Sequence, residues 1–189
     1  MTETERPLRA DARRNRERIL AAAGELFARR GEDAQMDEIA ARSGLGMGTL
    51  YRHFPSKQAL LTAIVGERFA EMAELARGAE EIDDPRAAFD ELLRIYLEAA
   101  ARDAAFQRAL LGPDELEWEG IGGGKQAFAE LAERILARAV AAGAVRGDLT
   151  FADFVLITRG VMSTMYLGAY REHDWRRHLQ LALEGLAAD

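Results

Sequence analysis

The 189-residue chain contains no cysteine. That absence excludes a disulfide framework, a thiol nucleophile and any metal site built on cysteine ligands. Proline and lysine are also scarce, with 4 and 2 residues, whereas arginine occurs 23 times and alanine 36 times. Because alanine favours helices and proline interrupts them, the composition predicts an all-α fold.

We expect neither a secretory leader nor a membrane-spanning segment from the sequence. Its first 18 residues are polar, and the apolar segment Gly160–Tyr170 has 11 residues, too few to cross a bilayer. We therefore expect a cytoplasmic protein that does not enter the membrane. A net charge of −7 and a pI of about 5.2 argue against a uniformly basic nucleic-acid binder.

The charge is unevenly spread along the chain. Met1–Lys57 holds 11 basic and 9 acidic residues, or +2, whereas the remainder holds 14 and 23, or −9. Within the first part, Arg6–Arg18 contains six arginines and only two acidic residues. This pattern fits an anionic partner for the basic segment alone, although a solvated helix face would have the same composition.

Apolar periodicity predicts about nine helices, with short ones near the N-terminus and longer ones after them. The expected helices cover Arg16–Arg30, Met36–Ser43, Met47–Phe54, a long helix after Ser56, one starting at Pro85, Ala104–Leu111, and three that carry Phe128, Phe154 and Trp175. Gly112–Gly124 is expected to be irregular. We divide the chain into a domain at residues 1–57 and a second domain at residues 58–189.

Residues 36–57, MDEIAARSGLGMGTLYRHFPSK, have the pattern of a helix-turn-helix. Gly44 falls where the turn needs a left-handed residue, and Leu50 and Phe54 are apolar positions that pack two short helices onto a third. The second short helix then exposes hydroxyl, phenol, guanidinium and imidazole groups, which bind phosphates and base edges. Lys57 opens the next helix, where the dipole disfavours a cation and a phosphate contact would explain one.

Residues 40–61, AARSGLGMGTLYRHFPSKQALL, resemble the helix-turn-helix of the tetracycline-repressor (TetR) family of transcriptional regulators. The family's run G-x-L-Y-x-H-F-x-S-K occurs from Gly48 to Lys57, and the resemblance covers about residues 13–62. It implies a homodimer that places the second short helix in the major groove of a double-stranded DNA operator. The DNA-binding residues it implies are Arg13, Arg14 and Arg16 before the first helix, then Gly46, Met47, Thr49, Tyr51, His53 and Lys57.

Two positions depart from the family pattern. Gln35 stands where the family usually has a capping threonine, and Gly46 where it usually has serine. Both changes weaken an N-cap, and each removes a hydroxyl that would contact phosphate.

The second domain is expected to bind a small-molecule effector. Its apolar, methionine-rich and aromatic positions suit an adaptable pocket, although plain core is the alternative for each of them. The candidate ligand-binding residues are Leu93, Tyr96, Leu97, Trp118, Phe154, Arg159, Met162, Met165 and Tyr166. Arg159 would pair either with an acidic ligand or with a carboxylate such as Glu98.

The resemblance also implies that the last two helices form the dimer. The apolar stripe offered for that interface is Trp175, Leu179, Leu183 and Leu186. A monomer with a buried terminal helix would have the same stripe.

No enzyme, cofactor or metal site is expected. His173 and His178 are five residues apart, off the spacing that places two ligands on one helix face. The segment Gly120–Lys125 lacks the first glycine and the final Ser/Thr of a phosphate loop, so a flexible connector is expected there.

The sequence thus predicts a ligand-responsive dimeric repressor that a small molecule releases from a palindromic operator. The alternatives are an activator, or a helical small-molecule-binding protein with a vestigial DNA-binding head.

Overall fold

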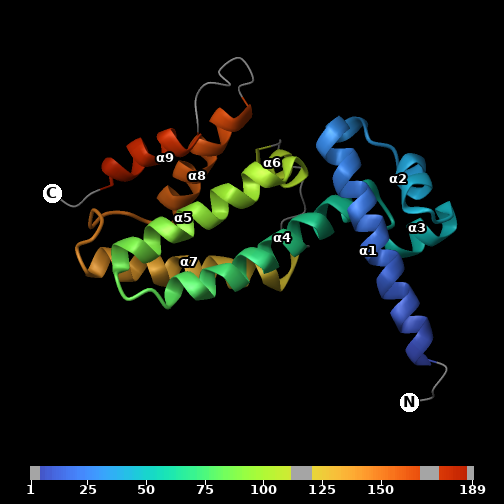
Figure 1. The fold of residues 1–189 in the computed structure, drawn as a ribbon, viewed down its shortest axis with the longest axis horizontal. Coiled ribbons are helices and arrows are strands. Elements are labelled where there is room, and N and C mark those ends of the chain that lie inside the picture. Colours follow the sequence, from blue (N-terminus) through green and yellow to red (C-terminus); the bar gives the residue numbers. More distant parts are fainter. Residues whose placement is uncertain (1–4, 112–120, 167–174, 187–189) are drawn as a thin grey trace.

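The computed structural model describes residues 5–111, 121–166 and 175–186. These residues form nine α-helices and one 3-10 helix, with no strand among them, which confirms the predicted all-α class (Figure 1). The elements are α1 (Glu5–Arg30), η1 (Gly31–Asp33), α2 (Met36–Ser43), α3 (Met47–His53), α4 (Lys57–Glu80), α5 (Pro85–Arg102), α6 (Ala104–Leu111), α7 (Gly123–Ala141), α8 (Phe151–Tyr166) and α9 (Trp175–Glu184).

The helices pack around two separate hydrophobic cores. The head consists of α1, α2, α3 and the first two turns of α4, and its core includes Ile19, Ile39 and Leu50. The body contains the rest of the described chain. Helix α4 runs from the head into the body and serves both cores, with Ile64 in the first and Val65 in the second (Figure 1). The domain boundary at residue 57 stays a prediction, because the head core continues along α4.

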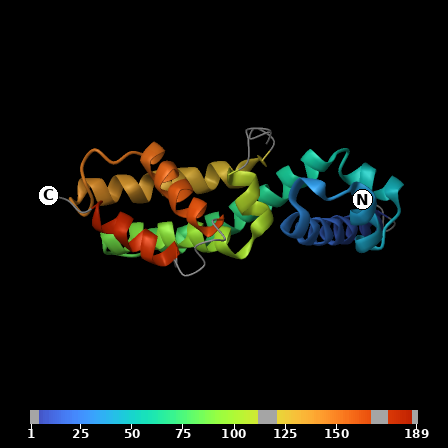
Figure 2. The same ribbon diagram turned by 90° about the horizontal axis from the view of Figure 1, so that it is seen from above.

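The head and body lie side by side along the long axis of the molecule (Figure 2). Besides α4, helix α6 joins them, since it contacts both α1 and α4. No helix among the described residues is long and apolar enough to cross a membrane.

Side-chain caps fix the starts of several helices where the sequence predicts them. The Ser56 hydroxyl accepts a hydrogen bond from the Ala59 N–H at 3.1 Å, and the Asp84 carboxylate accepts one from the Arg86 N–H at 2.9 Å. Pro85 occupies the first position of α5, where its missing N–H costs nothing. Each such cap typically stabilises a helix by about 1 kcal/mol.

Helix α1 starts earlier than the sequence predicts. It begins at Glu5, so Arg13, Arg14 and Arg16 lie inside a helix, and the prediction that they precede it is wrong. Arginine, alanine and glutamate are good helix formers, and Pro7 falls within the first turn, where proline is tolerated. The basic segment is therefore part of a 26-residue helix.

Helix α7 also starts earlier than expected, within the segment predicted to be a flexible connector. It begins at Gly123, and Gly124 packs closely against α4. A Cβ on Gly124 would lie 2.9 Å from the Ala70 nitrogen and 3.0 Å from the Gly66 oxygen. The missing Cβ of Gly124 therefore lets the backbones of α4 and α7 approach each other. Residues 112–120 lie outside the described residues.

Candidate nucleic-acid interface

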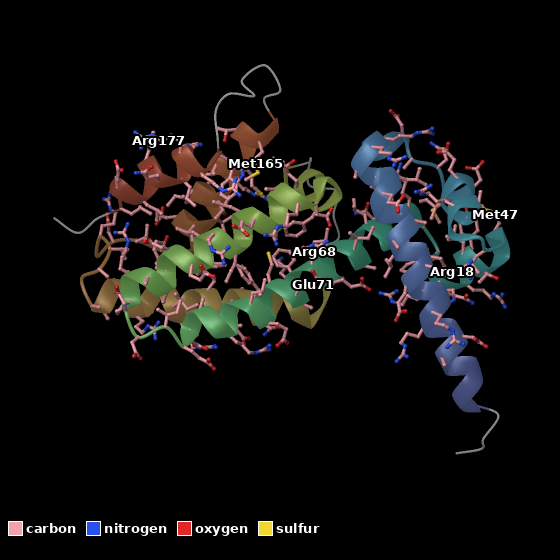
Figure 3. All side chains as sticks on the ribbon, viewed as in Figure 1. Arg18, Met47, Arg68, Glu71, Met165 and Arg177 are labelled. Carbon is pink, nitrogen blue, oxygen red and sulfur yellow. The ribbon has the colours of Figure 1, made fainter. Side chains whose placement is uncertain are left out.

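The turn between α2 and α3 has the left-handed residue that the sequence predicts. Gly44 adopts φ 66° and ψ 29°, and the N–H groups of Gly44 and Leu45 donate to the last carbonyls of α2. From α1, Arg18 donates its Nη2 to the Ser43 carbonyl at 2.6 Å (Figure 3). Arg18 therefore fixes the turn, and this contact within the head accounts for one of the six arginines of the basic segment.

Helix α3 has one buried and one exposed face. Leu50 is fully buried, and Phe54, just beyond the helix, packs into the same core. By contrast, Met47 is 38% exposed and Tyr51 is 47% exposed, and Arg52 is exposed as well. Met47 lies on the outer edge of the head, away from the body (Figure 3). A short helix exposed in this way fits the width of the DNA major groove.

The other residues predicted at this surface lie along its flank. Thr49 and His53 are half-buried on α3, and Lys57 is the half-buried first residue of α4. Gly46 forms the N-cap of α3 without a side-chain hydrogen bond, as its missing hydroxyl predicts. The structure thus gathers the predicted residues from Gly46 to Lys57 around one short helix.

The predicted arginines of α1 each pair with a carboxylate. Arg13 lies 3.6 Å from Glu17, Arg14 pairs with Asp11, and Arg16 lies 3.7 Å from Glu67 on α4. Arg16 also covers the Phe54 ring, 4.8 Å from its centroid. Solvent-exposed pairs of this kind are worth about 0–1 kcal/mol, so exchange for a phosphate partner costs little.

Partial burial raises the pKa of Glu67, although the nearby Arg16 charge acts in the opposite direction. A raised pKa means that the ionised form of Glu67 gains no net stabilisation in the folded chain. The contact between Arg16 on α1 and Glu67 on α4 is therefore a weak ion pair. Among the described residues, no cluster of three or more acidic or histidine side chains is arranged to hold a metal.

Arg52 belongs to the exposed face of α3. The sequence predicts its guanidinium among the groups that bind phosphates and base edges, although the family resemblance does not include it among the DNA-binding residues. Its Nε donates to the Gly48 carbonyl at 3.2 Å, and its Nη2 donates to the Thr49 hydroxyl at 3.0 Å. The spacing of three and four residues on one helix is the signal in the sequence that predicts these contacts.

Most of the candidate ligand-binding residues lie in the core of the body. Leu93, Leu97, Phe154 and Met162 are buried there, and the Tyr96 and Phe154 rings meet edge to face at 5.7 Å. Burial raises the pKa of Tyr96 to about 12, although the Arg159 charge and the Thr158 hydroxyl act in the opposite direction.

The remaining ligand candidates are more exposed. Met165 is half-buried, and its sulfur accepts a hydrogen bond from the buried Gln107 amide at 3.1 Å. Arg159 is exposed, and the carboxylate proposed for it, Glu98, pairs instead with Arg94 and Arg102. Trp118 and the side chain of Tyr166 lie outside the described residues.

The stripe predicted for the dimer interface packs mainly within the single chain. Leu179 and Leu186 are buried in the body core, and Trp175 and Leu183 are half-buried against it. Among the side chains of α8 and α9 that the structure describes, the large apolar ones that are exposed are instead Leu156 and Leu181, at 66% and 50% exposure.

A three-helix head that exposes one short polar helix, joined to a larger helical body, defines a helix-turn-helix transcriptional regulator. The model of bacterial regulatory proteins of the tetR family matches residues 19–64, and that of the SbtR-like transcriptional regulator C-terminal domain matches residues 84–188. The crystal structure of a TetR transcription regulatory protein from Mycobacterium vanbaalenii is 35% identical, with a TM-score of 0.61. That match covers 96% of this chain and 100% of the other. The chain belongs to the TetR family of bacterial transcriptional regulators.

Two further comparisons are more limited. An HTH-type transcriptional regulator of Staphylococcus aureus is 46% identical over 59 residues, which are 31% of this chain and 32% of that protein. The chain thus matches about a third of the length of that relative. The regulator FadR of Bacillus subtilis, solved with stearoyl-CoA, is 18% identical over 89% of this chain and 95% of its own, with a TM-score of 0.73. This second likeness is one of fold.

Proposed function

We propose that this chain is a dimeric repressor that binds a palindromic operator through α3, and that a small molecule bound in the body releases it. The observation that carries the proposal is the exposed face of α3 with Met47, Tyr51 and Arg52, held on the buried Leu50. Tyr51, His53 and Lys57 offer donors to phosphates, and the α1 arginines add positive charge beside them.

A dimer is proposed because one α3 reaches too few base pairs. Two heads related by a two-fold axis would read two half-sites about one helical turn apart. Leu156 on α8 and Leu181 on α9 are large, exposed and carried by helices that contact each other. We place the dimer surface over these two residues, with Trp175 and Leu183 beside them.

We place the effector in the body, near Tyr96, Phe154, Met165 and the Gln107 amide. The Bacillus regulator solved with stearoyl-CoA supports this fold as a host for a small molecule. The effector must bind the DNA-incompetent arrangement more tightly than the competent one, because equal affinity shifts nothing.

The route from body to head runs through α4 and α6. Arg68 on α4 donates to Asp103 at 2.7 Å, and the other Asp103 oxygen accepts from the Phe106 N–H at 3.0 Å, which caps α6. Since α6 also contacts α1, a change in the position of α6 would move the head relative to the body.

The test uses the full chain and a DNA duplex selected from a randomised pool. We expect fluorescence anisotropy to show sequence-specific binding that weakens steeply with salt, because lysine and arginine contacts release counterions. Tyr51→Ala should weaken specific binding by about 10-fold or more, since a hydrogen bond to a charged group is worth about 1.5–3 kcal/mol. Its melting temperature should stay that of wild type, because Tyr51 is exposed.

Leu75→Ala serves as a matched control, because Leu75 is an exposed residue of α4 outside the head. It should leave DNA binding unchanged. If the wild type prefers no sequence over random DNA, the repressor proposal is wrong and a helical small-molecule-binding protein becomes the better description. An unchanged affinity of Tyr51→Ala would remove Tyr51 from the interface.

A further inference from the structure

The Arg52 side chain is held against its own helix. Its Nε donates to the Gly48 carbonyl at 3.2 Å and its Nη2 to the Thr49 hydroxyl at 3.0 Å, and both acceptors lie one turn closer to the start of α3. The guanidinium therefore lies back toward the N-terminal half of the helix. Gly48 leaves this surface open, because a Cβ there would meet no atom within 4 Å.

The contacts that hold Arg52 leave one edge of the guanidinium available. Nε and Nη2 form the edge that faces the helix, whereas Nη1 and the second hydrogen of Nη2 form the outer edge. Among the described residues, Gly48 and Thr49 are the only hydrogen-bond partners of Arg52. The outer edge thus presents two parallel N–H groups on an exposed side chain.

Two parallel N–H donors match the O6 and N7 acceptors of guanine in the major groove. In a helix-turn-helix, the N-terminal residues of the second helix are the ones that meet base edges. Because Arg52 lies back over Gly48 and Thr49, its guanidinium reaches that end of α3, where Met47 also lies (Figure 3). This placement favours a base contact over a phosphate contact.

We propose that Arg52 reads a guanine of the operator, and that Thr49 is a positioning residue that holds the guanidinium for this contact. The inference rests on the proposed binding of an operator by α3. Thr49 is half-buried, and its hydroxyl already accepts from Arg52. Fixing a flexible arginine before it meets DNA reduces the rotamer freedom lost on binding.

The first test compares wild type and Arg52→Ala on a duplex selected by the full chain. Each base pair of one half-site is replaced in turn, and binding is measured by anisotropy. Wild type should discriminate against replacement of one G·C pair by about 10- to 100-fold, and Arg52→Ala should lose that preference alone. Replacing the same guanine with 7-deazaguanine removes the N7 acceptor, so it should weaken wild type and leave Arg52→Ala unaffected.

A phosphate contact would give a different result. Arg52→Ala would then weaken binding to every sequence by the same factor and reduce the slope of log affinity against log salt by about one. That outcome would overturn the assignment of a base to Arg52. Melting temperatures of both proteins control for folding, which the exposed position of Arg52 should leave intact.

The second test isolates the Thr49 hydroxyl with two variants. Thr49→Val keeps the shape and removes the hydroxyl, whereas Thr49→Ser keeps the hydroxyl. We expect Thr49→Val to reduce discrimination at the same G·C pair and Thr49→Ser to retain it. In the Arg52→Ala background, Thr49→Val should have no further effect. An equal loss in both backgrounds would mean that Thr49 contacts DNA itself, and would overturn its positioning role.

Failure of this inference differs from failure of the proposed function. If wild type selects a sequence and Arg52→Ala keeps every base preference, only the Arg52 assignment is wrong. If wild type selects no sequence at all, both the repressor proposal and the Arg52 assignment are wrong.

Discussion

At the scale of single residues, two glycines of the helix-turn-helix differ in why they are glycine. Gly44 adopts a left-handed φ of 66°, and a Cβ there would lie 2.7 Å from the Arg18 Nη2. Gly48 lies inside α3 without a positive φ, and a Cβ there would meet nothing within 4 Å. The fold therefore requires a glycine at position 44 but not at position 48.

This difference predicts opposite effects of the same substitution. Gly44→Ala should lower the free energy of unfolding by about 1–2 kcal/mol, because a left-handed alanine is strained and Arg18 must leave the Ser43 carbonyl. Gly48→Ala should raise it by about 0.5–1 kcal/mol, because alanine favours a helix interior. Urea unfolding measures both, and a shift in the same direction for the two variants would contradict this account.

The sequence predicts the local contacts of the head better than the distant ones. Gly44 and the apolar Leu50 and Phe54 follow from spacing within one motif, and their places are confirmed. Arg18 could not be assigned, since the Ser43 carbonyl that it binds is 25 residues away. Its charge alone suggested an anionic partner.

At the scale of the helix, α8 starts with a capping box that includes a titratable carboxylate, that of Asp153. The Thr150 N–H donates to the Asp153 carboxylate at 2.9 Å, and the Asp153 N–H donates back to the Thr150 hydroxyl at 3.3 Å. The Thr150 hydroxyl and N–H, which both donate to the carboxylate, lower the pKa of Asp153 from its ordinary 3.8.

The hydrogen bonds from Thr150 stabilise the ionised form of Asp153 in the folded chain. Their contribution to the free energy of unfolding is therefore complete above the pKa that Asp153 has in the unfolded chain. It is lost as the pH falls through the lower, folded pKa. Wild type should therefore be more stable than Asp153→Asn near pH 6, and the difference should shrink as the pH falls below about 4. Urea unfolding of both proteins across this range measures it. A difference that widens toward low pH would rule out the assigned bonding.

Two adjacent glycines at the start of α7 give a second test at this scale. A Cβ on Gly124 would lie 2.9–3.1 Å from backbone atoms of Gly66 and Ala70, whereas one on Gly123 would meet nothing within 4 Å. Gly124→Ala should lower the free energy of unfolding by about 1–3 kcal/mol, because α4 and α7 must separate. Gly123→Ala is the control and should not destabilise the protein. Equal melting temperatures for the two variants would refute the close contact.

Helix boundaries were predictable where capping residues mark them, as at Ser56, Asp84 and Thr150. The starts of α1 and α7 could not be predicted in this way. Arg13 and its neighbours are good helix formers without a stop signal, and Gly124 enters a helix because α4 packs against it. A contact of that kind between distant segments overrides the local preference of glycine for a turn.

At the scale of the whole molecule, the sequence identifies apolar residues without saying what each one faces. Leu93 and Phe154 are predicted pocket residues but lie in the core, while Leu179 of the predicted dimer stripe is buried within its own chain. Amphipathic periodicity gives the apolar side of a helix, but the partner on that side depends on how all the helices pack.

The last prediction concerns the surface that joins two chains. Leu156 and Leu181 are 66% and 50% exposed on the adjacent helices α8 and α9, while Leu75 is 59% exposed on α4. The double variant Leu156→Glu/Leu181→Glu should be monomeric in sedimentation experiments, since two carboxylates from each chain would be desolvated at the interface. It should fold normally, because neither side chain is buried within the chain.

Leu75→Glu places one such charge on a comparably exposed leucine outside the proposed surface and should remain dimeric. On the selected operator, the monomeric variant should lose most of the affinity that two linked half-sites provide, and its binding should no longer depend on their spacing. Wild type and Leu75→Glu should instead lose affinity when five base pairs, about half a helical turn, are inserted between the half-sites, because one head then faces away from its groove. A double variant that stays dimeric would place the interface elsewhere on the body.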